Sequence, residues 1–340
     1  MKIDILCGSG SPDGVSLHDL HGTDGRVGVG GAEYALLTLC EAWSKEHQVV
    51  VYNNARRQND FFEQRRVNTF DKDEDRDVFI VFREPTSKII GAKGLKIFFS
   101  CDQYTTGDFR HFSQFVDKTV TISPFHSKYF AQRYEIRSPI HIDLPVRTWE
   151  YDKEVEKIPF RLIFTSVPDR GLEIVRRTFP AIRDALPETS LVITSDYRLW
   201  GVGQARNESF VASFNGEKNV QYLGAVTRDR LIQEQLKAQI HYYPFSGETE
   251  ELFCIAAAES QVAGVLPITS SKGALETTNM GVLIDGDVRD PAVQRAFVQK
   301  TIDYLTNPTL PEIQKNLQGR ALERFDINVI TKQWQEKVFQ

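Results

Sequence analysis

The segment from Gly247 to Ser260 reads GETEELFCIAAAES and gives the clearest indication of the fold. It follows a mostly apolar run, Ile240 to Tyr243, which predicts a buried strand. A proline and a glycine end that strand, and we expect a helix to begin near Thr249 to Glu251 and to stop at Gly264. A helix that begins directly after a strand points free backbone N–H groups into a crevice, which is a natural anion site.

Two glutamates flank the small residues of this stretch. On a helix, Glu251 and Glu259 lie about two turns apart, so their faces are only partly offset. We expect the N–H groups of Phe253, Cys254 and Ile255 to hold a phosphate, and the two carboxylates to accept hydrogen bonds from hydroxyls. A ligand that combines a diphosphate with several hydroxyls is a nucleotide sugar. The alternative is a plain acidic amphipathic helix.

The pattern E-x-F-x5-E-x4-G-x2-P-I, from Glu251 to Ile268, resembles the E-x7-E signature of retaining family-four glycosyltransferases. Two further segments, 273–277 and 281–284, resemble the continuation of that family's motif. The resemblance covers nearly the whole chain. It implies an α/β fold with two Rossmann-like doubly wound domains that face a central cleft, the GT-B arrangement.

The length of 340 residues suits two domains of about 150 residues each. We expect an N-terminal acceptor-side domain at 1–150, a charged linker at 151–158 and a C-terminal nucleotide-sugar domain at 159–322. By resemblance, residues 323–340 form a closing helix that returns to the first domain.

Composition excludes several classes of protein. The net charge of −5 argues against general nucleic-acid binding, which needs a basic surface. No apolar run approaches the roughly 20 residues that span a membrane, and Met1 to Cys7 reads as a first strand rather than a signal peptide. The four cysteines have no metal-ligand or redox spacing, which suits a reducing, cytoplasmic compartment. Peripheral membrane contact through a local basic face stays open.

A glycine cluster, Gly28 to Glu33, precedes a second helical pattern. A dinucleotide-binding turn is disfavoured, because about twenty residues separate the glycines from the first strand and no acid ends the second strand. Gly30 and Gly31 instead belong to a segment that resembles the family's G-G-x-E loop, which implies contact with the donor diphosphate and the acceptor. Glycines also permit close backbone approach. The alternative is a structural turn.

Two more strand ends carry candidate residues. In many relatives one of these strand ends reads His-Asp, and the His lies near the donor sugar. Here Asp102 matches the Asp, Cys101 stands at the His position, and packing is the favoured role for that thiol. Arg170 fits the family's Lys/Arg-Gly position, whose cation neutralises the leaving diphosphate. The family's earlier arginine is not evident near Val167, and Lys272 is a candidate replacement. The alternative for Arg170 is a surface arginine at a helix start.

The expected reaction is transfer of a sugar from a nucleotide-diphosphate donor to a glycan, lipid-linked or small-molecule acceptor, by resemblance with retention of anomeric configuration. Glu251 orients the donor sugar, Glu259 binds the ribose hydroxyls, and Arg170 with Gly31 and the 253–255 N–H groups stabilises the growing negative charge. No Asp-x-Asp stands at a suitable strand end, which predicts metal independence and no cofactor beyond the donor. Acceptor specificity is expected in the loops 8–28 and 104–110, and a nucleobase beside 196–207.

Rival interpretations remain within and outside this class. A sugar-nucleotide epimerase of the same fold would convert the donor with no acceptor present. A phosphorylase would bring a pyridoxal lysine and a longer chain. Cys101 and the missing arginine motivate a non-catalytic nucleotide-sugar-binding protein, and a dehydrogenase is the least favoured of these.

Overall fold

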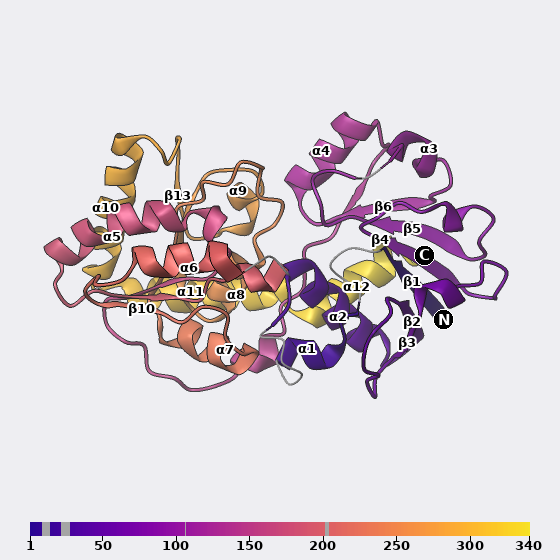
Figure 1. Cartoon of the computed structure of the whole chain (residues 1–340), viewed down its shortest axis with the longest axis horizontal. Helices are drawn as coiled ribbons and strands as arrows, with labels where there is room; N and C mark the ends of the chain where they lie inside the picture. Colours follow the sequence, from indigo (N-terminus) through magenta and orange to yellow (C-terminus); the bar gives the residue numbers. More distant parts are fainter. Residues whose placement is uncertain (9–13, 22–27, 106, 201–203) are drawn as a thin grey trace. The chain divides into compact units, whose positions relative to one another are not determined.

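The structure is a computed structural model that describes residues 1–8, 14–21, 28–105, 107–200 and 204–340. Contacts within the chain define two units, which are described separately. The first is built on residues 29–145, with the N-terminal strand and Asp326–Gln340; the second is Val146–Phe325. Each unit holds a parallel sheet with helices, so the predicted pair of Rossmann-like α/β domains is confirmed. Figure 1 shows the elements of both.

The first unit contains a seven-stranded sheet in the order β3-β2-β1-β4-β5-β6-β7, with every pairing parallel. The order reverses between β1 and β4, and this switch point is where ligands bind in open α/β sheets. The central strands are mostly apolar, as expected for a sheet that is covered on both faces, whereas the edge strand is polar. The strands are β1 (Lys2–Cys7), β2 (Gln48–Tyr52), β3 (Glu63–Arg65), β4 (Val78–Phe82), β5 (Leu95–Phe99), β6 (Lys118–Thr121) and β7 (Ile140–His141).

The C-terminal helix belongs to this first unit, where it packs beside α2 (Figure 1). Trp334 meets Trp43 edge to face with ring centroids 5.1 Å apart, and it contacts Phe99 of the sheet at 5.0 Å. Lys118 Nζ donates to the carbonyl of Val338 at 2.9 Å. The helices of this unit are α1 (Leu17–His21), α2 (Gly31–Trp43), α3 (Phe109–Ser113), α4 (Pro124–Tyr134) and α12 (Ile327–Lys337), with 3-10 turns η1 (Val67–Thr69) and η2 (Ser87–Ile89).

The second unit repeats the same winding in a six-stranded sheet, ordered β10-β9-β8-β11-β12-β13 and again parallel throughout. Its switch point lies between β8 and β11. The strands are β8 (Arg161–Phe164), β9 (Ser190–Ile193), β10 (Val220–Tyr222), β11 (Ile240–Tyr243), β12 (Leu266–Ser270) and β13 (Val282–Ile284).

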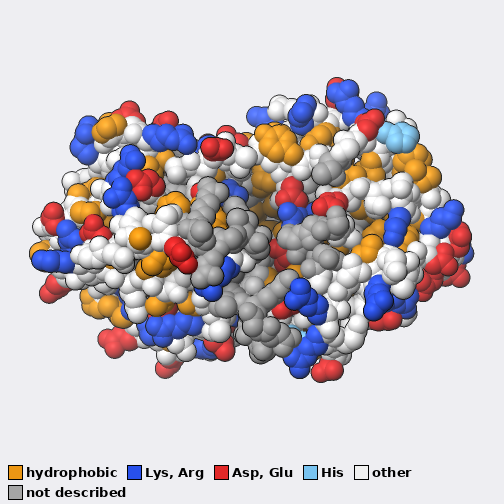
Figure 2. All heavy atoms as spheres, in the orientation of Figure 1, with side chains coloured by type: hydrophobic (Ala, Val, Ile, Leu, Met, Phe, Trp, Pro, Cys, Tyr) orange, Lys and Arg blue, Asp and Glu red, His pale blue; other side chains and the backbone are white. Residues whose placement is uncertain are grey.

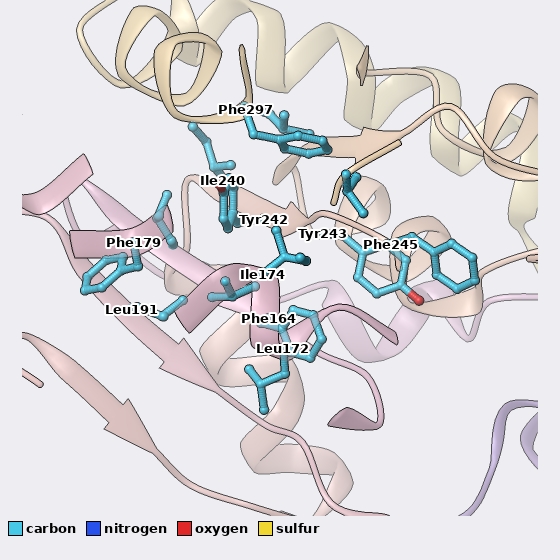
Figure 3. Close-up of a cluster of buried hydrophobic side chains, with 14 of the residues drawn as sticks. Phe164, Leu172, Ile174, Phe179, Leu191, Ile240, Tyr242, Tyr243, Phe245 and Phe297 are labelled. Carbon is cyan, nitrogen blue, oxygen red and sulfur yellow. The ribbon is translucent and has the colours of Figure 1, made fainter. Parts of the chain in front are cut away.

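The core of this unit lies between the sheet and its helices, and Figure 3 shows part of it, with Tyr243 and Phe245 side by side. Thr227 caps α7 (Arg228–Lys237) by accepting from the N–H of Arg230. The helices are α5 (Leu172–Ala185), α6 (Gln204–Ser213), α7 (Arg228–Lys237), α8 (Ile255–Val262), α9 (Leu275–Thr278), α10 (Pro291–Leu305) and α11 (Leu310–Phe325), with 3-10 turns η3 (Thr148–Tyr151), η4 (Pro168–Arg170) and η5 (Tyr197–Trp200).

Some expectations differ from the structure or fall outside it. The expected helix start at Thr249–Glu251 is wrong, because α8 begins only at Ile255. β3 escaped prediction because its residues are polar and form an edge strand. Parts of the expected acceptor loop 8–28 and of the nucleobase loop 196–207 lie outside the described residues. On the face drawn in Figure 2, side chains of both charge signs are interspersed.

In the second unit, the ammonium of Lys157 is surrounded by backbone carbonyls. Its Nζ donates to the carbonyls of Leu236 at 3.2 Å, Ala238 at 2.9 Å and Ala263 at 3.2 Å. These carbonyls lie at the C-terminal ends of α7 and α8, where a cation complements the helix dipole. Burial lowers the pKa of Lys157 to about 8.

We expect this lysine to make stability depend on alkaline pH. The pKa of about 8 in the folded chain lies below the unfolded value of about 10.4, so between these values the unfolded state binds more protons and stability rises with pH. Relative to Lys157→Met, the wild type should gain roughly 1–3 kcal/mol between pH 7.5 and 10, measured by urea unfolding. The exposed Lys153→Met should show no such trend. If the difference in unfolding free energy between the wild type and Lys157→Met does not change with pH, the three carbonyls keep the ammonium charged.

Candidate functional site

The candidate site of the second unit lies at the switch point of its sheet. β8 ends at Phe164 and leads into the η4 turn with Arg170, while β11 ends at Tyr243 and leads into the loop before α8. Because β8 and β11 are parallel neighbours, both loops leave the same edge of the sheet. Gly171 brings them together: its φ of 133° is open to glycine, and a Cβ there would lie 2.3 Å from the carbonyl oxygen of Pro244.

Glu251 lies at the centre of this edge. Tyr243 Oη donates to its Oε2 at 3.1 Å, and an Arg170 guanidinium nitrogen lies 3.6 Å from the same oxygen. Its backbone carbonyl accepts from the N–H of Ala274 at 2.7 Å. A Cβ on Gly273 would lie 2.4 Å from that carbonyl, so only glycine allows this close approach. The carboxylate is therefore contacted by one side chain from β11 and one from the turn that follows β8.

The protonation states of the neighbours follow from burial. Burial, reinforced by the Glu251 charge, raises the pKa of Tyr243 well above its ordinary value, so its hydroxyl stays a hydrogen-bond donor. The same two causes raise the pKa of Cys254, and that thiol stays protonated. For Arg170, burial opposes the charge, but Glu251 and other neighbours raise the pKa overall, and the cation persists.

Two cationic side chains contact the loop between β11 and α8. The guanidinium of Arg170 and the ammonium of Lys272 each lie 5.4 Å from the ring centroid of Phe245. Lys272 Nζ also donates to the carbonyl of Gly247 at 2.8 Å. The structure thus brings Lys272, the candidate second cation of the sequence, to the same loop as Arg170.

The start of α8 corrects the sequence-based placement of its glutamates. Cys254 precedes the helix with a left-handed φ of 70°, and Ile255 is the first helical residue. Phe253 is buried and meets the ring of Phe325 edge-on at 5.9 Å. Glu251 consequently lies in a loop, and the expectation of two glutamates on one helix fails. The 251–254 segment is kept out of the helix by the close contact with Gly273 and by the left-handed turn.

Glu259 lies within α8 and has different partners from Glu251. Its carboxylate accepts from Arg228 at the start of α7. Arg228 Nε donates to Glu150 at 2.7 Å, and Glu150 in turn accepts from Arg147 Nε at 2.7 Å. The result is a buried chain of alternating charges.

The first unit holds a second polar cluster at its own switch point. Arg83 directly follows β4 and donates to both carboxylate oxygens of Asp102 at 2.6 Å. Its third nitrogen donates to Glu33 at 2.9 Å. Burial disfavours the guanidinium charge, but these carboxylates raise the pKa of Arg83. Counting these three side chains as charged, the cluster carries one net negative charge.

Gly30 and Gly31 lie at the start of α2, with Glu33 in its first turn. A Cβ on Gly30 would lie 2.4 Å from Glu33 Oε2, so the chain's own carboxylate faces the positive end of this helix. This arrangement favours an uncharged ligand over a phosphate at the Gly30–Gly31 turn.

The backbone of Asp102 is held by a neutral histidine. His126 Nδ1 accepts from the N–H of Ile122 at 3.4 Å, so Nε2 carries the proton and donates to the Asp102 carbonyl at 3.1 Å. Burial lowers the pKa of His126 to about 4, which keeps the ring neutral. Burial and the Asp102 charge raise the pKa of Cys101 well above its ordinary value, which argues against a nucleophilic role for that thiol.

Sequence reasoning missed Arg83, Tyr243 and Arg228 as site residues. For the first two a signal existed: each ends or directly follows a strand beside a switch point, where functional side chains gather. Across the described residues, no group of three or more His, Cys, Asp or Glu side chains is placed to hold a metal ion. Within the same part of the chain, no helix has the length and apolar content that crossing a bilayer requires.

No family model matches the chain, and no curated protein matches it in sequence. Solved structures do match. HepE from Anabaena, determined in complex with UDP and glucose, is 14% identical with a TM-score of 0.70, covering 99% of both chains. A glycosyltransferase from Rickettsia africae is 12% identical with a TM-score of 0.71, covering 98% of this chain and 97% of its own. Sucrose-phosphate synthase from Thermosynechococcus elongatus is 14% identical with a TM-score of 0.67, covering 98% and 97%. At these identities the likeness shows a shared fold.

Proposed function

We propose that the protein is a glycosyltransferase that moves a sugar from a nucleotide-diphosphate donor to an acceptor hydroxyl. The observation that carries the proposal is Glu251, held by Tyr243 and Arg170 at the switch point of a doubly wound sheet. Lys272, from the loop after β12, donates to the Gly247 carbonyl on the loop that carries Glu251. A fixed carboxylate suits sugar hydroxyls, and paired cations suit a diphosphate. The fold shared with glycosyltransferases supports this assignment.

In the proposed reaction, the bond between the anomeric carbon and the diphosphate oxygen breaks while the acceptor oxygen forms its bond to the same carbon. Retention places the acceptor on the face that the diphosphate leaves, and the acceptor proton passes to the departing diphosphate. Arg170, Lys272 and the N–H groups of 253–255 stabilise the negative charge that grows on the leaving group. Glu251 orients the donor sugar, and these cations serve in place of a metal ion.

The first unit is proposed to serve the acceptor. Asp102 and Glu33 accept hydrogen bonds from hydroxyls, Arg83 keeps both carboxylates in place, and Gly30 and Gly31 allow close approach. The net negative charge of the cluster favours a neutral glycan, lipid-linked sugar or small-molecule acceptor over an anionic one. The free cysteines suit a reducing cytoplasmic location, with peripheral membrane contact if the acceptor is lipid-linked.

Thermal-shift measurements with UDP-, GDP-, ADP- and TDP-glucose test the donor class. HepE binds UDP and UDP-glucose, which makes the UDP donor the first choice. We expect one nucleotide series to raise the melting temperature, and proton NMR of the product to show the donor's anomeric configuration. Conversion of the donor without acceptor would instead indicate an epimerase. Binding with no turnover across a wide acceptor screen would indicate a binding protein, and no binding at all would contradict the proposal.

A further inference from the structure

A chain of four alternating charges is buried in the second unit. It runs from Glu259 through Arg228 and Glu150 to Arg147. The side-chain exposures of these residues are only 5 to 11%. Removing charges from water is costly, and such chains are often no more stabilising than apolar replacements. Stability alone therefore gives little reason for these four charges to be buried together.

Arg228 is fixed from several sides. Its guanidinium divides its donors, with Nε on Glu150 and another nitrogen on Glu259. It also lies over the ring of Tyr151 at 5.8 Å, and the Tyr151 hydroxyl donates to Gln235 of the same helix at 2.7 Å. Glu150 is held on its other oxygen by Arg147, which stacks on Trp149 at 4.6 Å. Arg228 therefore offers Glu259 a rigid cationic anchor.

We infer that Arg228, itself anchored by Glu150, is a positioning residue that aims the Glu259 carboxylate at the ribose hydroxyls of the donor nucleotide. This inference rests on the proposed function and extends it to sugar-ring selection. One carboxylate oxygen is oriented by Arg228, so the geometry of the other is set before the ligand arrives. The preference for a ribonucleotide then depends on residues that do not themselves touch the ribose.

Binding of UDP, ADP, GDP and CDP, each compared with its 2′,3′-dideoxy counterpart by calorimetry, tests this inference. For the base that binds, the wild type should favour the ribonucleotide roughly tenfold to hundredfold, as a hydrogen bond to a charged group allows. Arg228→Lys keeps the charge but cannot fork two carboxylates, so the preference should fall about tenfold. Glu150→Gln should lower it by a smaller factor, about threefold. Affinity for the dideoxy compound should stay within about twofold in both variants.

A matched control lies on the same helix. Arg230→Lys alters an exposed arginine that pairs with Glu234, and it should leave the ratio unchanged. If both variants bind nucleotide with the wild-type ratio, the positioning role is wrong while the proposed function stands. An equal loss for ribose and dideoxy compounds would also overturn it, because that result indicates general damage to the fold. If no nucleotide binds to the wild type, the proposed function fails together with this inference.

Discussion

Glu251→Gln is expected to lower the rate of sugar transfer by roughly 10²–10³-fold while the protein stays folded. The amide keeps the size of the side chain and can still accept from Tyr243. The variant lacks the negative charge that pairs with Arg170 and that strengthens hydrogen bonds from the donor hydroxyls. Binding of the free nucleoside diphosphate should change little, because Glu251 is assigned to the sugar. Steady-state kinetics and calorimetry with UDP separate the two effects.

Glu248→Gln is the matched control, because this exposed glutamate lies on the same loop three positions earlier. It should retain wild-type activity. Unchanged turnover in Glu251→Gln would show that Glu251 does not orient the donor sugar. An equal loss of UDP binding and of sugar transfer would show that Glu251 acts on the diphosphate instead.

Arg170→Ala should reduce turnover by about 10²–10³-fold, the effect of deleting a donor that stabilises transition-state charge. The guanidinium lies 3.6 Å from a carboxylate oxygen of Glu251, and its charge persists despite burial. Affinity for the diphosphate product should weaken as well. Added guanidinium ion should restore part of the lost rate, which a purely structural defect would not allow.

Arg177→Ala, on the outer face of α5 and paired with Glu173, supplies the control with the same substitution. Its kinetics should match the wild type. Full activity in Arg170→Ala would show that leaving-group charge is stabilised by other groups, with Lys272 the first to test.

Much of the fold could be predicted from the sequence, because strands buried on both faces read as apolar runs. The run 240–243 matches β11 residue for residue, and the first strand expected within 1–7 is β1 at Lys2–Cys7. The start of α8 could not be predicted, since it depends on a left-handed Cys254 and on a contact with Gly273, which is distant in sequence. Tertiary contact here overrides helix propensity.

The candidate site was only partly visible for a similar reason. Glu251 and Arg170 belong to local motifs, and the structure brings them together. The partnership of Arg228 with Glu150 spans 78 positions, and that of Arg83 with Glu33 spans 50. A local sequence pattern cannot indicate such pairs, because their residues come together only in the folded chain.

The four native thiols have a practical consequence for spectroscopy, because Cys7, Cys40 and Cys254 are buried and Cys101 is partly buried. The thiolate is the form that attacks alkylating reagents, and the raised pKa values of Cys40, Cys101 and Cys254 keep that form scarce at neutral pH. A single cysteine engineered on the surface should therefore accept a maleimide dye or spin label ahead of these native thiols. Distance measurements on the wild-type background then become feasible without first deleting them.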